Sequence, residues 1–497
     1  MALRLVGTVE MPGQFAGRTV LVAGAGISGI AAAEALLAAE ARTLVSDDRA
    51  AALEDLPAGA EAVTGLPEGV ELIVTGPGRR PDHPLVAEAA ARGIEVVGEP
   101  ELAWRLGQER EVPPVWLVVT GTNGKTTCTG MLAAILRAAG LDAVACGNIG
   151  YPVVSAVAAG HAVLAVELSS FQLHWSPSVV PAAGLVLNVA EDHLDWHGGL
   201  DAYAAAKARA LTGSVAVAGA DDTIAARLLR ESPAPTKVGV TLAEPGPGQL
   251  GIVGEQLVDR AFPASRDVLQ RESGAPAARV ASSGEGVVLA EVSDVTPGGP
   301  PGLTDALAAA ALARAHGVGP GAVREGLAGF RPGPHRSAHV GTVAGVRYVD
   351  DSKATNPHAA DAALAAQPAG RIVWVVGGLL KGAHVDGLVA RHADRLAGAV
   401  IIGTDRAEIV DALARHAPQI PAVEVTQGDD EVMSSAVRRA AALARPGDVV
   451  LLAPAAASMD QFRDYAERGE AFAAAVAALG ASAEAGAAEG GAGEPGA

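Results

Sequence analysis

A lysine and two threonines follow a short glycine-containing loop near residue 120, a combination that suits phosphate chemistry. The apolar run 115–119 leads into the loop residues Gly121, Thr122, Asn123, Gly124, Lys125, Thr126 and Thr127. In phosphate-binding loops the backbone N–H groups and the start of the next helix face the phosphates, lysine adds a point charge, and a hydroxyl reaches Mg²⁺. The loop is shorter than the usual motif, because Val119 stands at the position of the first glycine.

A second glycine-rich loop, residues 24–29, follows the apolar run 19–23 near the N-terminus. Its G-x-G-x-x-G spacing is followed by Asp47, at the distance expected for a ribose hydroxyl. The pattern leaves open NAD or FAD, another nucleotide, or no nucleotide at all. A later apolar run, 71–75, ends in Gly76-Pro77-Gly78, and ligands of open α/β sheets bind at such strand ends.

Polar residues also follow other apolar runs. Glu167 ends one apolar run, and its carboxylate suits Mg²⁺. His193 lies in the motif Glu-Asp-His-Leu-Asp and, taken by itself, could be an ordinary loop residue. Lys207 lies on an Ala-rich helical pattern and, taken by itself, could be a solvent-exposed surface residue. Arg336 is a candidate phosphate clamp, because its guanidinium is always charged and matches phosphate geometry. Further strand ends carry the acidic and basic run 350–356, Lys381 and Ser458. Together these positions predict chemistry at the carboxyl ends of parallel strands.

The alternation of apolar runs with helical patterns predicts an α/β protein with three domains across its 497 residues. We expect a Rossmann-like domain at 1–112, a central P-loop ATPase-type parallel sheet at 113–332, and a C-terminal Rossmann-like α/β domain at 333–480. Pro113-Pro114 marks the first boundary. The Gly- and Pro-rich stretch 244–302 is expected to be irregular β structure, and the Ala-, Gly- and Glu-rich tail 481–497 is expected to be disordered.

The bulk composition excludes several classes of protein. A formal net charge of −19 argues against a general nucleic-acid partner. Two cysteines without metal spacing exclude a disulfide framework and suit a reducing compartment. The sequence shows neither a signal-peptide pattern nor a membrane span. We therefore expect a cytoplasmic protein, a monomer, with no membrane partner.

Taken together, the motifs resemble those of the Mur ligases, ATP-dependent amide-forming enzymes of peptidoglycan precursor synthesis. The resemblance runs from about residue 18 to about residue 475. It rests on Gly-Thr-Asn-Gly-Lys-Thr-Thr, Gly-Asn-Ile-Gly, Glu-Leu-Ser-Ser-Phe-Gln-Leu, Glu-Asp-His-Leu-Asp, Pro-His-Arg and Asp-Asp-Ser-Lys-Ala-Thr-Asn. The third and last of these motifs most resemble the members that add D-glutamate. The resemblance implies ATP, two Mg²⁺ ions, a UDP-linked muramoyl-alanine substrate and D-glutamate.

The resemblance also implies roles for individual residues. The first domain would bind the UDP part of the substrate, through Ile27, Ser28, Asp47, Arg49 and Gly78, with Asn148 contacting the substrate from the central domain. ATP would be bound by Gly121, Thr122, Asn123, Gly124, Lys125, Thr126, Thr127, Asp305, Arg336 and Asp351. Metal ions would be held by Thr126 and Glu167, and by His193 and a carbamylated Lys207. D-glutamate would be bound by Thr355, Lys381, Ser458 and Tyr465. The catalytic residues would be Lys125, His193, Lys207, Arg336 and Lys353, with His335 also on the phosphate side.

The sequence departs from the family pattern at two positions. Asp305 stands where asparagine is expected; a carboxylate can accept a hydrogen bond from the adenine amino group but cannot donate one. Tyr465 stands where phenylalanine is expected. Four alternatives stay open: a sister ligase that adds another amino acid, a folylpolyglutamate synthetase-like ligase, an NAD-dependent oxidoreductase based on the loop 24–29, and a non-catalytic P-loop switch.

Overall fold

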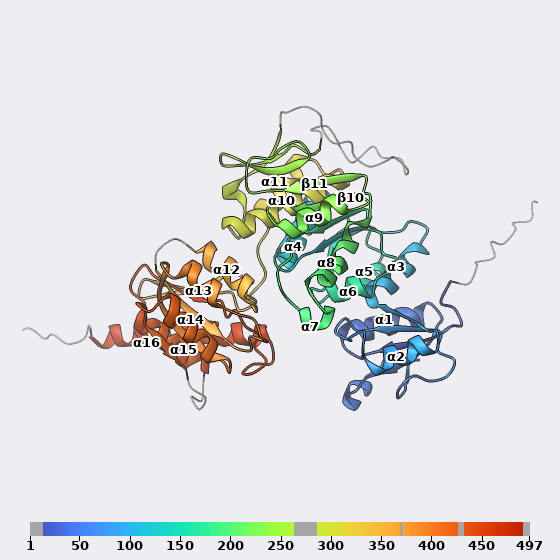
Figure 1. The fold of residues 1–497 in the computed structure, drawn as a ribbon, viewed down its shortest axis with the longest axis horizontal. Coiled ribbons are helices and arrows are strands. Elements are labelled where there is room, and N and C mark those ends of the chain that lie inside the picture. Colours follow the sequence, from blue (N-terminus) through green and yellow to red (C-terminus); the bar gives the residue numbers. More distant parts are fainter. Residues whose placement is uncertain (1–12, 263–285, 368–370, 426–431, 491–497) are drawn as a thin grey trace, which may run out of the picture. The chain divides into compact units, whose positions relative to one another are not determined.

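The computed structural model of the chain describes residues 13–262, 286–367, 371–425 and 432–490. These residues form three β-sheets with flanking helices (Figure 1), so the predicted α/β fold with three domains is confirmed. The elements group into two compact units, Met1–Asp294 with Thr304–Phe330 and Val295–Leu303 with Arg331–Ala497. The first two sheets therefore belong to one unit, and the domain boundaries at residues 112 and 332 stay predictions.

The first sheet has five parallel strands in the order β3-β2-β1-β4-β5. Its elements are β1 (Thr19–Ala23), α1 (Ile27–Ala38), β2 (Arg42–Ser46), the 3₁₀ turn η1 (Ala50–Leu53), β3 (Glu61–Ala62), β4 (Leu72–Thr75), α2 (Pro84–Ala91), β5 (Glu95–Gly98) and α3 (Glu99–Gln108). Strand β1 lies between β2 and β4, so the strand order reverses there, and the crevice at such a point is the usual ligand site. The loops 24–29 and 76–78 both lie at this point, where the Gly76 N–H donates to Ala23 O at 3.2 Å.

The central sheet has nine strands in the order β14-β13-β12-β11-β10-β9-β6-β8-β7. Its strands are β6 (Val115–Thr120), β7 (Ala143–Gly147), β8 (Val163–Glu167), β9 (Ala183–Val186), β10 (Val215–Gly219), β11 (Thr236–Val240), β12 (Gln249–Val253), β13 (Gln256–Asp259) and β14 (Val287–Glu291). Strands β12 to β14 pair antiparallel, so the stretch 244–302 is more regular than predicted over these strands; residues 263–285 lie outside the described part of the chain.

The helices of the central region are α4 (Lys125–Ala138), α5 (Val153–Ala158), α6 (Ser170–His174), α7 (Leu194–His197), α8 (Leu200–Ala208), α9 (Thr223–Glu231), α10 (Gly299–His316) and α11 (Pro320–Gly329), with 3₁₀ turns η2 (Arg209–Thr212) and η4 (Val292–Asp294). Strand β6 lies between β8 and β9, and it carries the phosphate loop at its carboxyl end. The register sets Val119 of β6 and Gly147 of β7 beside Glu167 of β8. Three loops with predicted function therefore begin at one level of the sheet.

The third sheet has six strands in the order β15-β16-β20-β17-β18-β19, with only the β15–β16 pair antiparallel. Its elements are β15 (Ala338–Val343), β16 (Val346–Asp350), α12 (Pro357–Ala366), β17 (Ile372–Gly377), α13 (Asp386–His392), β18 (Leu396–Ile402), α14 (Arg406–His416), β19 (Ala422–Glu424), α15 (Val432–Leu443), β20 (Val449–Leu452) and α16 (Tyr465–Gly490). Strand β20 lies between β16 and β17, so their carboxyl ends adjoin.

The tail prediction was wrong for residues 481–490. Helix α16 continues to Gly490, because alanine and glutamate have a high intrinsic preference for helices. Residues 491–497 lie outside the described part of the chain. Among the described residues, no helix is both long enough and apolar enough to cross a membrane.

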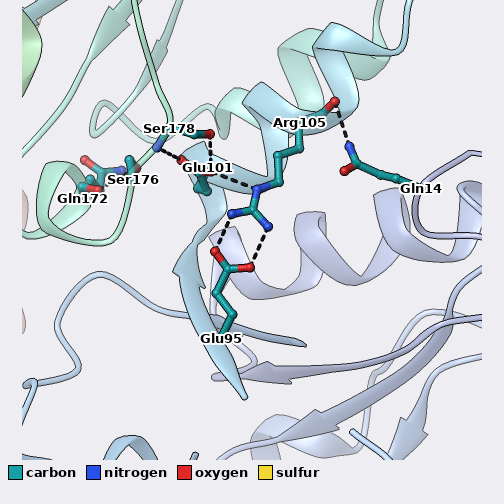
Figure 2. A network of polar contacts seen from close by, with 7 residues as sticks. All are labelled: Gln14, Glu95, Glu101, Arg105, Gln172, Ser176 and Ser178. Carbon is teal, nitrogen blue, oxygen red and sulfur yellow. Dashed lines mark hydrogen bonds and ion pairs between the residues drawn. The ribbon is translucent and has the colours of Figure 1, made fainter. Parts of the chain in front are cut away.

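The first and central sheets share one hydrophobic core. A single cluster of buried side chains runs from Val20 and Leu36 through Leu102 to Trp116 and Leu164. Burial of apolar surface against a common partner explains why these two regions form one unit. A polar network reinforces the same junction (Figure 2).

Two glutamates of α3 bond to backbone groups of the central region. Glu101 is fully buried and accepts hydrogen bonds from both the backbone N–H and the hydroxyl of Ser178. Arg105 lies between this carboxylate and Glu95 of β5, as Figure 2 shows, at 2.8 Å and 2.6 Å. Glu99 accepts from the Val154 N–H at 2.6 Å, at the start of α5. Helix α3 therefore fixes the first sheet to the central one.

We expect Glu99 to make stability depend on pH. Burial raises the pKa of Glu99 from 4.5 to about 7, so the folded protein holds this proton more tightly than the unfolded chain. The contribution of this bound proton to the free energy of unfolding is therefore full below pH 4.5 and is lost as the pH rises to about 7. Measured by denaturant unfolding, the stability of wild type relative to Glu99→Gln should fall by about 2 to 3 kcal/mol between pH 5 and pH 8. A difference that does not change with pH would contradict this account.

Candidate active site

The phosphate loop joins β6 to α4 in four residues, Gly121 to Gly124. Gly124 has a φ of 84°, and a Cβ atom there would overlap the Asp305 carboxylate, so glycine is required on two grounds. Because Gly124 is also the N-cap of α4, no side chain caps this helix end, and its first N–H groups keep the orientation that suits an anion.

Two lysines bond to the backbone of this loop. Lys125 Nζ donates to Gly121 O at 3.0 Å and to Thr122 O at 2.8 Å. Lys207, on α8, donates to the same Gly121 O at 2.7 Å and is 1% exposed. Burial, and next the charge of Lys125, lower the pKa of Lys207 well below its ordinary value. The structure thus buries Lys207 in a position that favours a neutral amine.

Glu167 lies at the carboxyl end of β8, next to the phosphate loop. It is 1% exposed, its Oε1 accepts from Asn148 Nδ2 at 2.9 Å, and its Oε2 has no hydrogen-bond partner among the described residues. A buried carboxylate oxygen without a donor suits a cation. The residues of the described ranges include no group of three or more His, Cys, Asp or Glu side chains that could hold a metal ion, so a cation here would need other donors, such as Thr126.

His193 begins the short helix α7 with a left-handed backbone, at φ 55°. Its ring packs against Phe171 with centroids 4.7 Å apart, and its side chain is 47% exposed. The neighbouring His197 ring stacks on the same Phe171, and its Nε2 lies 2.9 Å from Ser170 Oγ. Burial, followed by the charges of His174, Lys207 and His193, lowers the pKa of His197 to about 4. Lys207 and His193 therefore lie within electrostatic range of one ring.

Asp305 lies on α10, is 6% exposed, and has its carboxylate against Gly124. The structure brings this side chain to the loop itself, and the contact to adenine expected from the sequence stays a prediction. Thr126 and Thr127 occupy the first turn of α4, as predicted from the motif.

The predicted UDP-binding residues of the first sheet lie around the loops after β1 and β4. Asp47 accepts from the Ala25 N–H at 2.8 Å and from the Arg49 N–H at 2.9 Å, and these bonds lower its pKa. Ile27 is 71% exposed at the start of α1, and Gly78 is also exposed. Ser28 lines a pocket with Thr75, Pro77, Gly98, Glu99, Pro100, Gln172 and Trp175. This pocket lies at the junction of the first and central sheets.

The second unit gathers its predicted phosphate-side residues at the end of β16. His335 Nδ1 lies 2.6 Å from Asp350 Oδ2, and the Ser337 hydroxyl donates to Asp351 at 2.8 Å. Burial raises the pKa of Asp351 to about 6, against the lowering effects of Ser337 and Arg336. Lys353 Nζ lies 5.0 Å from the centroid of the Tyr465 ring.

Four residues are predicted to bind D-glutamate. Thr355, Lys381 and Ser458 lie on loops and Tyr465 lies at the start of α16, and hydrogen bonds connect these segments. Backbone bonds join Leu379 to Ala457 at 2.9 Å, next to Lys381 and Ser458. The Ala455 N–H donates to Ala354 O at 2.9 Å, beside Thr355, and the Ser352 hydroxyl donates to Tyr465 O at 2.8 Å. Residues far apart in the sequence are thus brought to one edge of the third sheet.

Two organising side chains were missed by the sequence analysis. Asn188, just after β9, bonds to Thr122 and Asn123 of the phosphate loop. Arg468 on α16 is fully buried and donates to Ser352 Oγ at 3.0 Å, Ser352 O at 2.8 Å and Ala456 O at 3.1 Å. Asn188 follows an apolar run, so the strand-end rule could have found it, whereas nothing local marks Arg468 as buried.

Comparison with known proteins identifies three matching family profiles. They are the Mur ligase MurD-like N-terminal domain at residues 18–98, the Mur ligase middle domain at 119–245, and the Mur ligase glutamate ligase domain at 335–456. Two relatives are named UDP-N-acetylmuramoylalanine–D-glutamate ligase. The Nocardia farcinica protein is 53% identical over 93% of this chain and 97% of its own length. The Thermobifida fusca protein is 51% identical over 93% of this chain and 99% of its own length.

Among solved structures, a UDP-N-acetylmuramate-alanine ligase from Thermotoga maritima shares the fold. It superimposes with a TM-score of 0.54 at 18% identity, over 92% of this chain and 98% of that one. At this identity the likeness concerns the fold alone.

We expect Arg468 to hold the loops after β16 and β20 in place. Arg468→Met keeps much of the volume but leaves Ser352 O and Ala456 O without their donor, so it should lower the free energy of unfolding by about 3 kcal/mol. Arg463→Met is the matched control, because the Arg463 side chain is 78% exposed and its ion pair with Glu467 contributes little. Denaturant unfolding of both variants is the measurement, and equal losses would contradict the assignment.

Proposed function

The chain belongs to the Mur ligase family, and from this premise we propose that it joins D-glutamate to UDP-N-acetylmuramoyl-L-alanine with ATP, in peptidoglycan precursor synthesis. The observation that supports ATP-driven chemistry most directly is the convergence of Lys125, Glu167 and Lys207 at the carboxyl end of β6 and β8. The two substrates are those in the names of the relatives that match over nearly the whole chain. The enzyme acts in the cytoplasm as a monomer.

The reaction proceeds in two steps. The carboxylate of the UDP-linked alanine attacks the γ-phosphorus of ATP, forming an acyl phosphate and releasing ADP. The amine of D-glutamate then attacks the acyl carbon, loses a proton, and the tetrahedral intermediate expels phosphate to leave an amide. Lys125 and the first N–H groups of α4 stabilise the negative charge on the transferring phosphoryl group. By resemblance to the family, we assign Arg336, Asp351, Lys353 and His335 to the nucleotide and its phosphates.

We propose two metal sites from the resemblance to the family. Thr126 and Glu167 would hold one Mg²⁺, a role supported by the unpartnered Glu167 Oε2. His193 and Lys207 would hold a second, and Mg²⁺ bound at these sites offsets the charge of the phosphates. Lys207 can be a ligand of a metal ion only if its positive charge is removed or reversed. We propose that its neutral amine adds to CO₂, which releases a proton and leaves an anionic carbamate oxygen.

The remaining site residues bind the two organic substrates. Around the ends of β1 and β4, Ile27, Ser28, Asp47, Arg49 and Gly78 bind the UDP group. Asn148 bonds to Glu167 and therefore lies where the acceptor carboxylate would meet the metal. Thr355, Lys381, Ser458 and Tyr465 bind the carboxylates of D-glutamate, at the edge of the third sheet.

ADP release from ATP tests the proposal, with the UDP-linked alanine substrate and a panel of D-glutamate, L-glutamate and meso-diaminopimelate. We expect turnover with D-glutamate alone. Lys125→Ala should lower kcat by about 100-fold or more, because it removes a cation at the developing charge. Lys237→Ala, which removes an exposed lysine of the same sheet, is the control and should leave kcat unchanged. Turnover with meso-diaminopimelate but not D-glutamate would contradict the substrate, and a Lys125→Ala rate near wild type would contradict the loop's role.

A further inference from the structure

We propose that Asn188 is a positioning residue for ATP, because its side-chain amide holds the shortened phosphate loop in its binding conformation. The inference rests on the proposed ATP role of residues 121–127. It concerns a residue outside the loop that reaches the nucleotide only through Thr122 and Asn123.

The Asn188 side chain bonds to both residues that separate the two loop glycines. Its Oδ1 accepts from the Thr122 N–H at 3.0 Å and from the Asn123 N–H at 2.9 Å. Its Nδ2 donates to Asn123 O at 3.3 Å, and its backbone oxygen accepts from the Thr122 N–H at 3.0 Å. One asparagine thus occupies the polar backbone groups of the loop on the side facing β9.

The length of the loop explains why a side chain is needed there. The usual motif places four residues between its glycines, and their successive N–H groups curl around the phosphates. Here only Thr122 and Asn123 lie between Gly121 and Gly124, and their N–H groups face Asn188 instead. The phosphates are therefore left to the N–H groups at the start of α4 and to Lys125, whose orientation depends on the turn that Asn188 fixes.

Further contacts hold the loop from α8 and from the chain after β9. The Thr122 hydroxyl lies 3.1 Å from the Tyr203 hydroxyl and accepts from the Ala190 N–H at 3.0 Å. Lys207, one turn after Tyr203, donates to Gly121 O. Without the Asn188 side chain the loop would keep these contacts and its backbone bond to Asn188 O, but it would lose the three side-chain bonds to Thr122 and Asn123, so it would loosen without unfolding. This predicts a specific loss of nucleotide binding.

The test compares Asn188→Ala with wild type in ADP binding by calorimetry and in the KM values of all three substrates. We expect the Kd for ADP and the KM for ATP to rise about 10- to 100-fold, since the three side-chain hydrogen bonds that order the loop are lost. The KM values for the UDP-linked substrate and D-glutamate should stay within about twofold, as expected for sites that do not depend on this loop. Asp221→Ala is the matched control. It removes acceptors of the Leu242 N–H and the Thr241 hydroxyl in the same sheet without touching the loop, and should leave ADP binding unchanged.

Asn188→Asp serves as a second variant because it keeps the shape and the accepting oxygen of asparagine. It loses the bond to Asn123 O and adds a negative charge beside the loop, so we expect weaker ADP binding, with a melting temperature near that of wild type. Wild-type ADP affinity in a folded Asn188→Ala or Asn188→Asp protein would overturn the inference, as would equal losses for all three substrates. Failure of the wild-type protein itself to bind ADP would instead overturn the proposed function.

Discussion

The carbonyl oxygen of Gly121 accepts hydrogen bonds from two lysines, and the central site depends on this shared acceptor. Two ammonium groups on one oxygen repel each other, and one of them, Lys207, is almost fully excluded from water. Desolvation of the buried ammonium, followed by repulsion from Lys125, lowers the pKa of Lys207 well below its ordinary value, and the charges of Asp192 and Glu167 oppose this shift.

The same principle, polar groups fixed by burial, organises the second unit. Arg468 is buried and bonds to backbone oxygens of two loops, and its desolvation lowers its pKa to about 10. The loops of the second unit contain residues with left-handed backbones that are not glycine, His335, Lys381 and Ala455 among them. Such conformations cost of order 1 kcal/mol each and persist only where surrounding contacts hold them. Lys381 and Ser458 are positioned in this way rather than by regular secondary structure.

Much of the fold follows from local patterns, because an apolar run of four to six residues in an alternating α/β sequence has few other outcomes. The polar residues after these runs were identified for the same reason, as Glu167 and Lys381 show. What could not be predicted depends on which strands become neighbours. The role of Asn188 requires β9 beside β6, the contact of Asp305 with Gly124 requires α10 at the phosphate loop, and the burial of Arg468 requires α16 against two loops. Low hydrophobicity predicts disorder at residues 481–490, but alanine favours helices independently of packing, and the chain is helical there.

The central proposal is that the Lys207 amine adds CO₂ to become a carbamate, and ¹³C NMR of the protein in ¹³C-labelled bicarbonate tests it most directly. The account predicts a carbamate resonance in wild type that is absent from Lys207→Arg, whose guanidinium cannot add CO₂. It also predicts that depleting CO₂ lowers ligase activity and that restoring bicarbonate recovers it. The absence of a carbamate resonance, together with full activity in CO₂-depleted buffer, would contradict the claim.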